Sequence, residues 1–336
     1  MGHRMGFIKK ITVNIFLSFF SIFIFLFITE LVLIRVFPVY KESPGPDSSY
    51  EITTQLYKIT VRTNSLNIRD REIPPKEKNE FRILCLGDSF TFGLGVEVED
   101  TYTRLLENLL NKDRKRSCVI NAGGGDPYDF LVDRGLALKP DLVLLQIYIG
   151  NDFYDRMSSI DPEVMSSVEM SRLIYGKIIS RATLNLVLSR LRQIRKTEEI
   201  LFYLDSKYSY MGIFLNEYPR LERLLAESEQ GYLRKIFDLC NNNGIQMLVL
   251  VVPWDMQFRK KYLMSSERYN YRKPNEILKT FFRKNNMTYI DLLDYYEKMP
   301  VEEAETLYYK RDIHWTKEGH RHAAEILAPV IKDMSD

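Results

Sequence analysis

The sequence of 336 residues has few cysteines and no excess of charge of either sign, and each shortage excludes a class of protein. Its three cysteines, Cys85, Cys118 and Cys240, are too few and too odd in number for a disulfide framework. None has a histidine or a second cysteine at the spacing of a metal site, so we expect no metal and no cofactor. The formal net charge of +2 gives no electrostatic reason to expect binding to nucleic acid.

Internal repeats and low-complexity tracts are also missing, whereas apolar residues are plentiful. Hydrophobic residues make up 45% of the chain and aromatic residues 12%, which is enough for a substantial core. A chain of this length has room for one large domain or for two small ones. The composition therefore predicts a folded domain and leaves its class to the pattern of apolar residues.

One long apolar run lies near the N-terminus. Residues 11–29 carry no charge, and a helix of about 19 residues spans roughly 28 Å, close to the thickness of the bilayer core. A cleaved signal peptide has a shorter apolar region and a small-residue cleavage site, so we predict an uncleaved transmembrane signal anchor over residues 11–36. Because basic residues precede the run, the positive-inside rule leaves residues 1–10 in the cytoplasm. The rest of the chain is then expected outside it, on the periplasmic or cell-surface side.

From Phe81 onward, short apolar runs alternate with helical patterns. Strands are predicted over residues 82–86, 118–121, 142–148, 245–252 and 287–292, and helices over 100–112, 128–138, 222–243, 274–285 and 317–332. Continuous apolar strands with helices between them predict a parallel sheet that is covered on both faces. We therefore expect a flavodoxin-like three-layer α/β/α domain over residues 81–334. Its central parallel five-stranded sheet should have the order 2-1-3-4-5 and right-handed crossovers.

Two further stretches lie before and within this domain. Residues 37–80 begin with a region rich in proline, serine and charge, and they predict a linker and an extended lead-in segment. Residues 155–221 are too long for an ordinary connection, so we expect a helical insertion on the carboxyl side of the sheet. Within it, residues 171–196 contain basic residues and no acidic one. Such a helix either lies on an anionic membrane surface or packs on the domain with a solvated basic face.

The first predicted strand ends in Gly87-Asp88-Ser89. Open α/β sheets bind their ligands at the carboxyl ends of their strands, where Ser89 is expected. If a helix begins just after Ser89, its hydroxyl lies near free backbone N–H groups and the positive end of the helix dipole. The alternative is that Ser89 is only the N-cap of that helix. A catalytic role for Ser89 requires a base, an orienting acid and an oxyanion site elsewhere in the chain.

Three later stretches supply such groups. Residues 121–127 contain three consecutive glycines after the second strand, and glycine lets backbone N–H groups approach a ligand closely. Gly150-Asn151-Asp152 follows the third strand, where a side-chain amide can donate to a developing oxyanion. Asp312-Ile313-His314-Trp315 precedes the last helix and pairs a histidine base with a carboxylate that can fix its tautomer. Each stretch alone is also an ordinary turn.

With these four blocks in this order, the chain resembles the SGNH hydrolases, also called the GDSL esterase/lipase superfamily, over roughly residues 81–332. The first and last blocks are similar to those of membrane-anchored bacterial members. The resemblance implies Ser89 as the nucleophile, His314 as the general base and Asp312 as its orienting acid. Many members place the acid three residues before the histidine, whereas Asp312 stands two residues before it.

The resemblance also implies an oxyanion hole. Its donors would be the Ser89 N–H, one glycine N–H and the Asn151 amide. Gly125 and Gly124 compete for the glycine position, and we favour Gly125. His320 and His322 lie in the last predicted helix and are expected to be surface or packing residues.

These features together predict a membrane-anchored extracytoplasmic serine esterase that hydrolyses an acyl ester, O-acetyl in our leading hypothesis, on an envelope glycan. Three alternatives remain open: an O-acyltransferase to a glycan, a lipid or lysophospholipid esterase, and a non-catalytic envelope assembly protein on a hydrolase fold. The expected partners are an acylated glycan or lipid substrate and the membrane, through the N-terminal helix.

Overall fold

The computed structural model describes residues 45–113, 116–150, 229–259, 269–310 and 312–335, together with residues 17, 20–21, 24–25, 28, 152, 213–214 and 216. One compact unit comprises Glu42–Asp161 and Asp205–Asp336. The predicted anchor over residues 11–36 and the predicted insertion over 155–221 lie almost entirely outside the described residues. Within the part that is described, no helix is long and apolar enough to cross a membrane.

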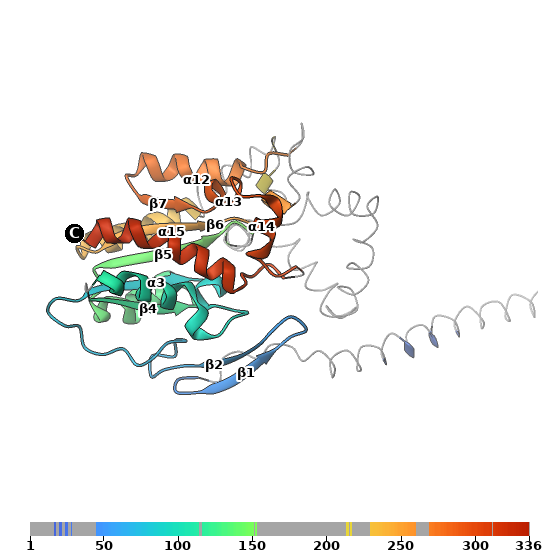
Figure 1. The fold of residues 1–336 in the computed structure, drawn as a ribbon, viewed down its shortest axis with the longest axis horizontal. Coiled ribbons are helices and arrows are strands. Elements are labelled where there is room, and N and C mark those ends of the chain that lie inside the picture. Colours follow the sequence, from blue (N-terminus) through green and yellow to red (C-terminus); the bar gives the residue numbers. More distant parts are fainter. Residues whose placement is uncertain are drawn as a thin grey trace, which may run out of the picture. The chain divides into compact units, whose positions relative to one another are not determined.

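A five-stranded parallel sheet forms the centre of this unit (Figure 1). Its strands are β3 (Phe81–Gly87), β4 (Ser117–Gly123), β5 (Leu142–Tyr148), β6 (Gln246–Val252) and β7 (Thr288–Asp291). They are hydrogen-bonded in the order β4-β3-β5-β6-β7, and every pairing is parallel. Numbered within the sheet, this is the predicted order 2-1-3-4-5, so the predicted sheet is confirmed. All residues of β5 are buried, as a strand covered on both faces requires.

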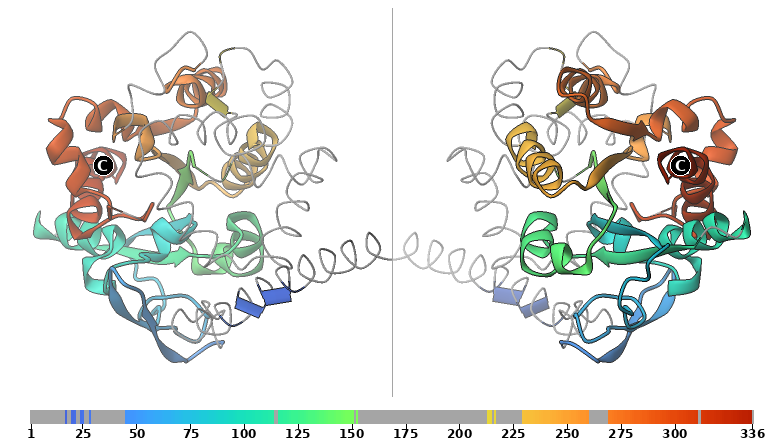
Figure 2. Two further views of the ribbon diagram at one scale, coloured as in Figure 1. Left: turned by 90° about the vertical axis from the view of Figure 1, so that its right-hand side faces the viewer. Right: turned by 90° about the vertical axis from the view of Figure 1, so that its left-hand side faces the viewer.

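Helices follow the strands and cover both faces of the sheet. The longer ones are α3 (Tyr102–Leu110), α10 (Glu229–Asn242), α12 (Lys273–Lys284) and α15 (Lys317–Ser335). The shorter ones are α2 (Ser89–Phe92), α4 (Pro127–Phe130), α11 (Met256–Arg259), α13 (Leu293–Tyr296) and α14 (Val301–Thr306). Figure 2 shows α3 and α15 together on one face of the sheet and α4 and α10 on the other.

Two of the predicted helices differ in detail from the structure. The pattern over residues 128–138 forms α4, followed by a π-helical turn at Leu131–Gly135 and a 3₁₀ turn at Leu136–Leu138. The pattern over 222–243 is described as α10 from Glu229 onward. The four short helices α2, α11, α13 and α14 have no prediction of their own. Segments of four to six residues are too short to show a helical period of apolar residues.

An antiparallel hairpin, β1 (Ser49–Thr53) and β2 (Lys58–Arg62), precedes the sheet. It lies within the predicted linker and lead-in segment over 37–80, for which no hairpin is predicted. The strands are short and polar on one face, so their sequence is similar to that of a solvent-exposed linker. The other face buries Ile52, Ile59 and Val61, which pack against Phe92 and Leu94 of the main domain.

Arg69 connects this N-terminal segment to the loop that follows α2. Its side chain is 1% exposed, and its guanidinium donates to the carbonyl oxygens of Gly93 at 2.7 Å and Val96 at 2.8 Å. The guanidinium also lies 5.3 Å from the centroid of the Phe92 ring. A buried cation is tolerated only when its N–H groups find acceptors, and here the backbone carbonyls supply them. The residues before β3 therefore fix the loop just beyond Ser89.

Candidate active site

Ser89 is the first residue of α2 and stands two residues beyond the end of β3. The N-cap of this helix is Asp88, whose Oδ1 accepts a hydrogen bond from the Phe90 N–H at 2.8 Å. Ser89 is therefore not the capping residue, and its hydroxyl is left for another partner. Gly87 is required before it, because a Cβ there would lie 2.4 Å from the Gln146 Oε1 atom and 2.5 Å from the Thr91 Oγ1 atom.

That partner is His314. Its Nε2 atom lies 2.7 Å from the Ser89 Oγ, and its Nδ1 atom is hydrogen-bonded to the Asp312 Oδ1. The same Oδ1 accepts the backbone N–H of His314 at 3.0 Å. The structure thus brings together the three residues that the sequence motifs place in a catalytic triad, over a separation of 225 residues between Ser89 and His314. A spacing of two residues between acid and base is compatible with this contact.

The electrostatics of Asp312 suit an orienting acid. Burial raises its pKa, but hydrogen bonds from the His314 side chain and backbone, the histidine's charge and the Tyr57 hydroxyl outweigh burial and hold it below the usual range. The carboxylate is therefore charged at neutral pH. A charged acceptor at Nδ1 holds the imidazole in the tautomer whose Nε2 can take the serine proton, and it stabilises the imidazolium that forms.

The His314 loop is held against the Ser89 helix by aromatic packing. Trp315 is completely buried, and its ring meets the Phe90 ring edge-on at 4.9 Å between centroids. The Phe90 ring also lies 5.5 Å from the His314 imidazole. Phe90 and Trp315 directly follow Ser89 and His314 in sequence, so their contact holds the segments that carry these two residues against each other. The sequence motif includes both residues but does not show that they touch.

The predicted oxyanion donors differ in their surroundings. The Ser89 N–H makes no hydrogen bond within the described part of the chain, so it can donate to a ligand. The Gly124 N–H instead donates to the Gly87 carbonyl at 2.9 Å. Gly125 is exposed, and its N–H makes no hydrogen bond to any residue that the structure describes. Gly125 is thus the better candidate of the two glycines, while Asn151 lies outside the described residues.

A second carboxyl group lies beside the nucleophile. The Asp88 Oδ2 atom is buried and has no hydrogen-bond partner within the described ranges. Burial raises the pKa of Asp88 to about 8, and the neighbouring charge of Asp152 adds to the rise. Asp88 is therefore mostly protonated at neutral pH and places no negative charge next to a developing oxyanion. The sequence shows Asp88 only as a turn residue, because a pKa shift depends on burial that a single sequence does not display.

The other histidines of α15 have no part in this cluster. His320 is fully buried, and its Nδ1 accepts the Tyr102 N–H at 3.2 Å, at the start of α3. Burial lowers its pKa to about 3, so it stays neutral. It is a packing residue, as expected.

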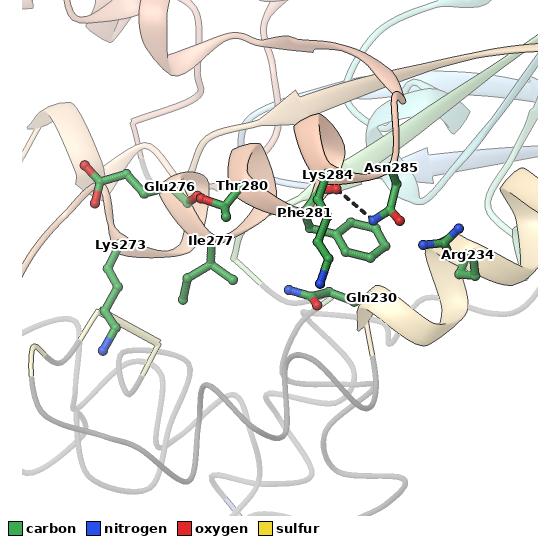
Figure 3. A pocket seen from close by; sticks show the side chains of 9 residues that line it. All are labelled: Gln230, Arg234, Lys273, Glu276, Ile277, Thr280, Phe281, Lys284 and Asn285. Carbon is green, nitrogen blue, oxygen red and sulfur yellow. Dashed lines mark hydrogen bonds between the residues drawn. The ribbon is translucent and has the colours of Figure 1, made fainter.

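A cavity of about 530 Å³ lies between α10 and α12 (Figure 3). Its lining residues are Gln230, Arg234, Lys273, Glu276, Ile277, Thr280, Phe281, Lys284 and Asn285. None of them belongs to the Ser89–His314–Asp312 cluster, so this cavity is not the candidate active site. No cluster of ligating side chains that could hold a metal ion occurs among the residues the structure describes.

The C-terminal part of the chain matches a known family. Residues 214–335 match the family described as "SGNH hydrolase-like domain, acetyltransferase AlgX". This range includes Asp312 and His314 but not Ser89. Comparison with curated proteins finds no match.

Several solved structures are similar to this chain at low identity. A putative lipolytic protein of the G-D-S-L family from Desulfitobacterium hafniense is 15% identical, with a TM-score of 0.41, and the match covers 74% of this chain and 99% of that one. An acetyl xylan esterase from Geobacillus stearothermophilus is 14% identical, with a TM-score of 0.39, and the match covers 74% of this chain and 90% of that one.

The family match covers the block around His314, and the sheet carries the Gly-Asp-Ser block at the end of its first strand. These findings confirm the resemblance drawn from the sequence motifs. They also make the protein an enzyme that acts on acyl esters, as a serine hydrolase or as an acyltransferase. Residues 214–335 thus belong to the SGNH hydrolase-like domain family.

Proposed function

We propose that the protein is a membrane-anchored, extracytoplasmic serine esterase that removes O-acetyl groups from an envelope glycan, with Ser89, His314 and Asp312 as its triad. The observation that carries this proposal is the 2.7 Å contact between the Ser89 Oγ and the His314 Nε2, with Asp312 on the other ring nitrogen. A serine that only caps a helix or packs in a turn has no need of a histidine oriented in this way. The anchor over residues 11–36 rests on the apolar run and its basic flank.

The reaction starts with attack of the Ser89 Oγ on the acyl carbonyl carbon, while His314 takes the hydroxyl proton. The negative charge that develops on the carbonyl oxygen is met by the N–H groups of Ser89 and Gly125 and by the Asn151 amide. His314 then gives its proton to the leaving sugar oxygen, and an acyl-enzyme remains on Ser89. Water, activated by His314, hydrolyses this ester and restores the serine.

A second candidate function is transfer of the acyl group to a sugar hydroxyl. The name of the matched family, which includes an acetyltransferase, favours this possibility. Transfer uses the same acyl-enzyme as hydrolysis. The two reactions differ only in the group that attacks this acyl-enzyme: in transfer, His314 removes the proton of a sugar hydroxyl instead of that of water. The two functions are separated by product analysis, because transfer raises the acyl content of an added glycan whereas hydrolysis lowers it.

The test uses the full chain in detergent, a serine-directed fluorophosphonate probe and a series of esters from acetyl to long-chain. We expect labelling at Ser89, preference for acetyl esters, and loss of at least about 10³-fold in turnover for Ser89→Ala. Ester cleavage that survives unchanged in Ser89→Ala contradicts the proposed triad. Preference for long acyl chains contradicts the glycan substrate and favours a lipid esterase.

A further inference from the structure

The turn of the β1–β2 hairpin reaches the orienting acid of the triad. The Tyr57 hydroxyl donates to the Asp312 Oδ2 at 3.5 Å, across 255 residues of sequence. The other carboxylate oxygen, Oδ1, already accepts the His314 backbone N–H and faces its ring. Tyr57 therefore supplies a hydrogen bond to Oδ2, the oxygen that His314 does not use.

The position of Tyr57 is itself determined by several contacts. The Thr54 hydroxyl accepts the Tyr57 N–H at 3.1 Å, and the Thr54 N–H donates to the Tyr57 carbonyl at 2.9 Å, which closes the turn. The Tyr57 ring lies 5.3 Å from the Tyr309 ring. Tyr309 in turn binds both sides of the site: its hydroxyl donates to the Gly95 carbonyl at 2.8 Å, and its N–H donates to the His314 carbonyl at 3.0 Å.

The hairpin as a whole is attached to the segment that follows the nucleophile. Ile59 and Val61 pack against Phe92 and Leu94, and the Thr60 N–H donates to the Glu97 Oε1 at 3.0 Å. These contacts join the hairpin to the Ser89 side of the site, while Tyr57 joins it to the Asp312 side. The hairpin thus connects the two halves of the triad.

We propose that Tyr57 is a positioning residue of the active site, acting on His314 through Asp312; this proposal rests on the proposed function of the triad. By donating to Oδ2, the hydroxyl limits rotation of the carboxylate, so that Oδ1 stays directed at the His314 Nδ1. It also takes up part of the carboxylate charge in a half-buried place. A distance of 3.5 Å is long for a hydrogen bond, so the expected effect is moderate.

Tyr57→Phe removes the hydroxyl and keeps the ring on Tyr309. Tyr50→Phe is the matched control, because Tyr50 belongs to the same hairpin and its buried hydroxyl has no partner among the described residues. For Tyr57→Phe we expect a roughly 3- to 10-fold lower kcat on an activated acetate ester, an unchanged KM and an unchanged Tm. Tyr50→Phe should leave both kinetic constants at the wild-type value.

The pH profile gives a second readout. Without the Tyr57 hydroxyl, the Asp312 carboxylate loses a hydrogen-bond donor and attracts the His314 imidazolium more strongly. The acid limb of the kcat/KM profile should therefore move to higher pH. Tyr309, Asp255 and Tyr148, the other described titratable groups whose pKa responds to the Asp312 charge, remain in every variant. A lower kcat with an unmoved acid limb contradicts the proposal and indicates a general loosening of the hairpin.

A double-mutant cycle with Asp312→Ala tests whether Tyr57 acts through the acid. In the Asp312→Ala background, Tyr57→Phe should have no further effect on kcat. An equal fold-change in both backgrounds overturns the proposal. Ser89→Ala is measured alongside: if it keeps wild-type activity, the triad itself fails. If it is inactive while Tyr57→Phe behaves as wild type, the triad stands and the role of Tyr57 is refuted.

Discussion

The turn that carries Ser89 and the loop that carries His314 each hold a partly buried aspartate, and the two carboxyl groups meet different donors. Asp88, in the turn, has a buried Oδ2 without a partner in the described structure, and its pKa is raised to about 8 by burial and by Asp152. Asp312, in the loop, accepts hydrogen bonds from His314 and Tyr57, and its pKa is lowered although burial raises it.

Burial raises the pKa of both groups. At Asp88 burial prevails and the charge of Asp152 adds to it, whereas at Asp312 the hydrogen bonds from His314 and Tyr57 and the charge of His314 outweigh it. Oδ1 of Asp312 has the backbone and ring of His314, and Oδ2 has the Tyr57 hydroxyl. Asp88 accepts a hydrogen bond from the Phe90 N–H, and the like charge of Asp152 lies nearby. The site therefore holds one acid ionised beside His314 and another neutral beside Ser89.

The largest effect is expected when the charged aspartate, Asp312, is neutralised. Asp312→Asn should lower kcat by about 10⁴-fold, because an amide donor facing Nδ1 favours the wrong imidazole tautomer. Steady-state hydrolysis of an activated acetate ester measures the loss. The matched control is Asp88→Asn, which changes the aspartate next to Ser89 in sequence and should keep most of the activity. Similar losses in both variants contradict the assignment of different roles.

A smaller effect is expected on the oxyanion side. Asn151→Ala should lower kcat by about 10²- to 10³-fold with little change in KM, because an oxyanion donor acts mainly in the transition state. The control is Asn121→Ala in the glycine block, because the Asn121 side chain is used within the fold, donating to Thr103 and accepting from the Gly123 N–H. That variant should lower Tm more than kcat. A change confined to KM for Asn151→Ala excludes it from the oxyanion hole.

The smallest effect concerns stability and its dependence on pH. In the unfolded chain Asp88 loses its proton near its ordinary pKa of 3.8, whereas the folded protein keeps it up to about pH 8. The folded state therefore binds more protons in this window, and stability falls as pH rises through it. Asp88→Asn removes that dependence and should raise Tm by roughly 2–6 °C at pH 8.5, with little change at pH 4.

Asp312→Asn should behave in the opposite way in the same thermal scans. The folded pKa of Asp312 is depressed, so its contribution to stability is present above the unfolded pKa and is lost as pH falls. The variant should thus be less stable than the wild type at neutral pH and approach it at acidic pH. A uniform Tm shift across pH for either variant would show that ionisation is not the cause.

Much of the fold could be predicted because the central strands are continuous apolar runs. The sequence predicts a strand over Leu142–Tyr148 with the bounds that the structure gives. A strand buried on both faces is a continuous apolar run, so its first and last residues are easy to recognise. The hairpin was missed for the converse reason. Its strands bury only Ile52, Ile59 and Val61, and they gain their packing partners from residues near Phe92, more than thirty positions later.

The candidate site shows the same division. Ser89, Asp312 and His314 could be named from motifs, because nucleophile, acid and base chemistry requires particular residue types. Their catalytic roles stay predictions until the variants are measured. Gly124 could not be separated from Gly125, because only the backbone hydrogen bond to Gly87 distinguishes them. Asn151 remains a prediction from its motif alone.

The amino-acid sequence by itself determined the class of sheet and the residue types available for acyl chemistry, because these follow from local periodicity and short motifs. Only the tertiary structure decided that Asp88 is neutral and Asp312 charged, and that Tyr57 reaches the latter. The physical reason is that desolvation and hydrogen-bond donors come from segments far apart in the chain, 255 residues apart for Tyr57 and Asp312. Such contacts exist only after the hairpin and the His314 loop have packed on the same sheet.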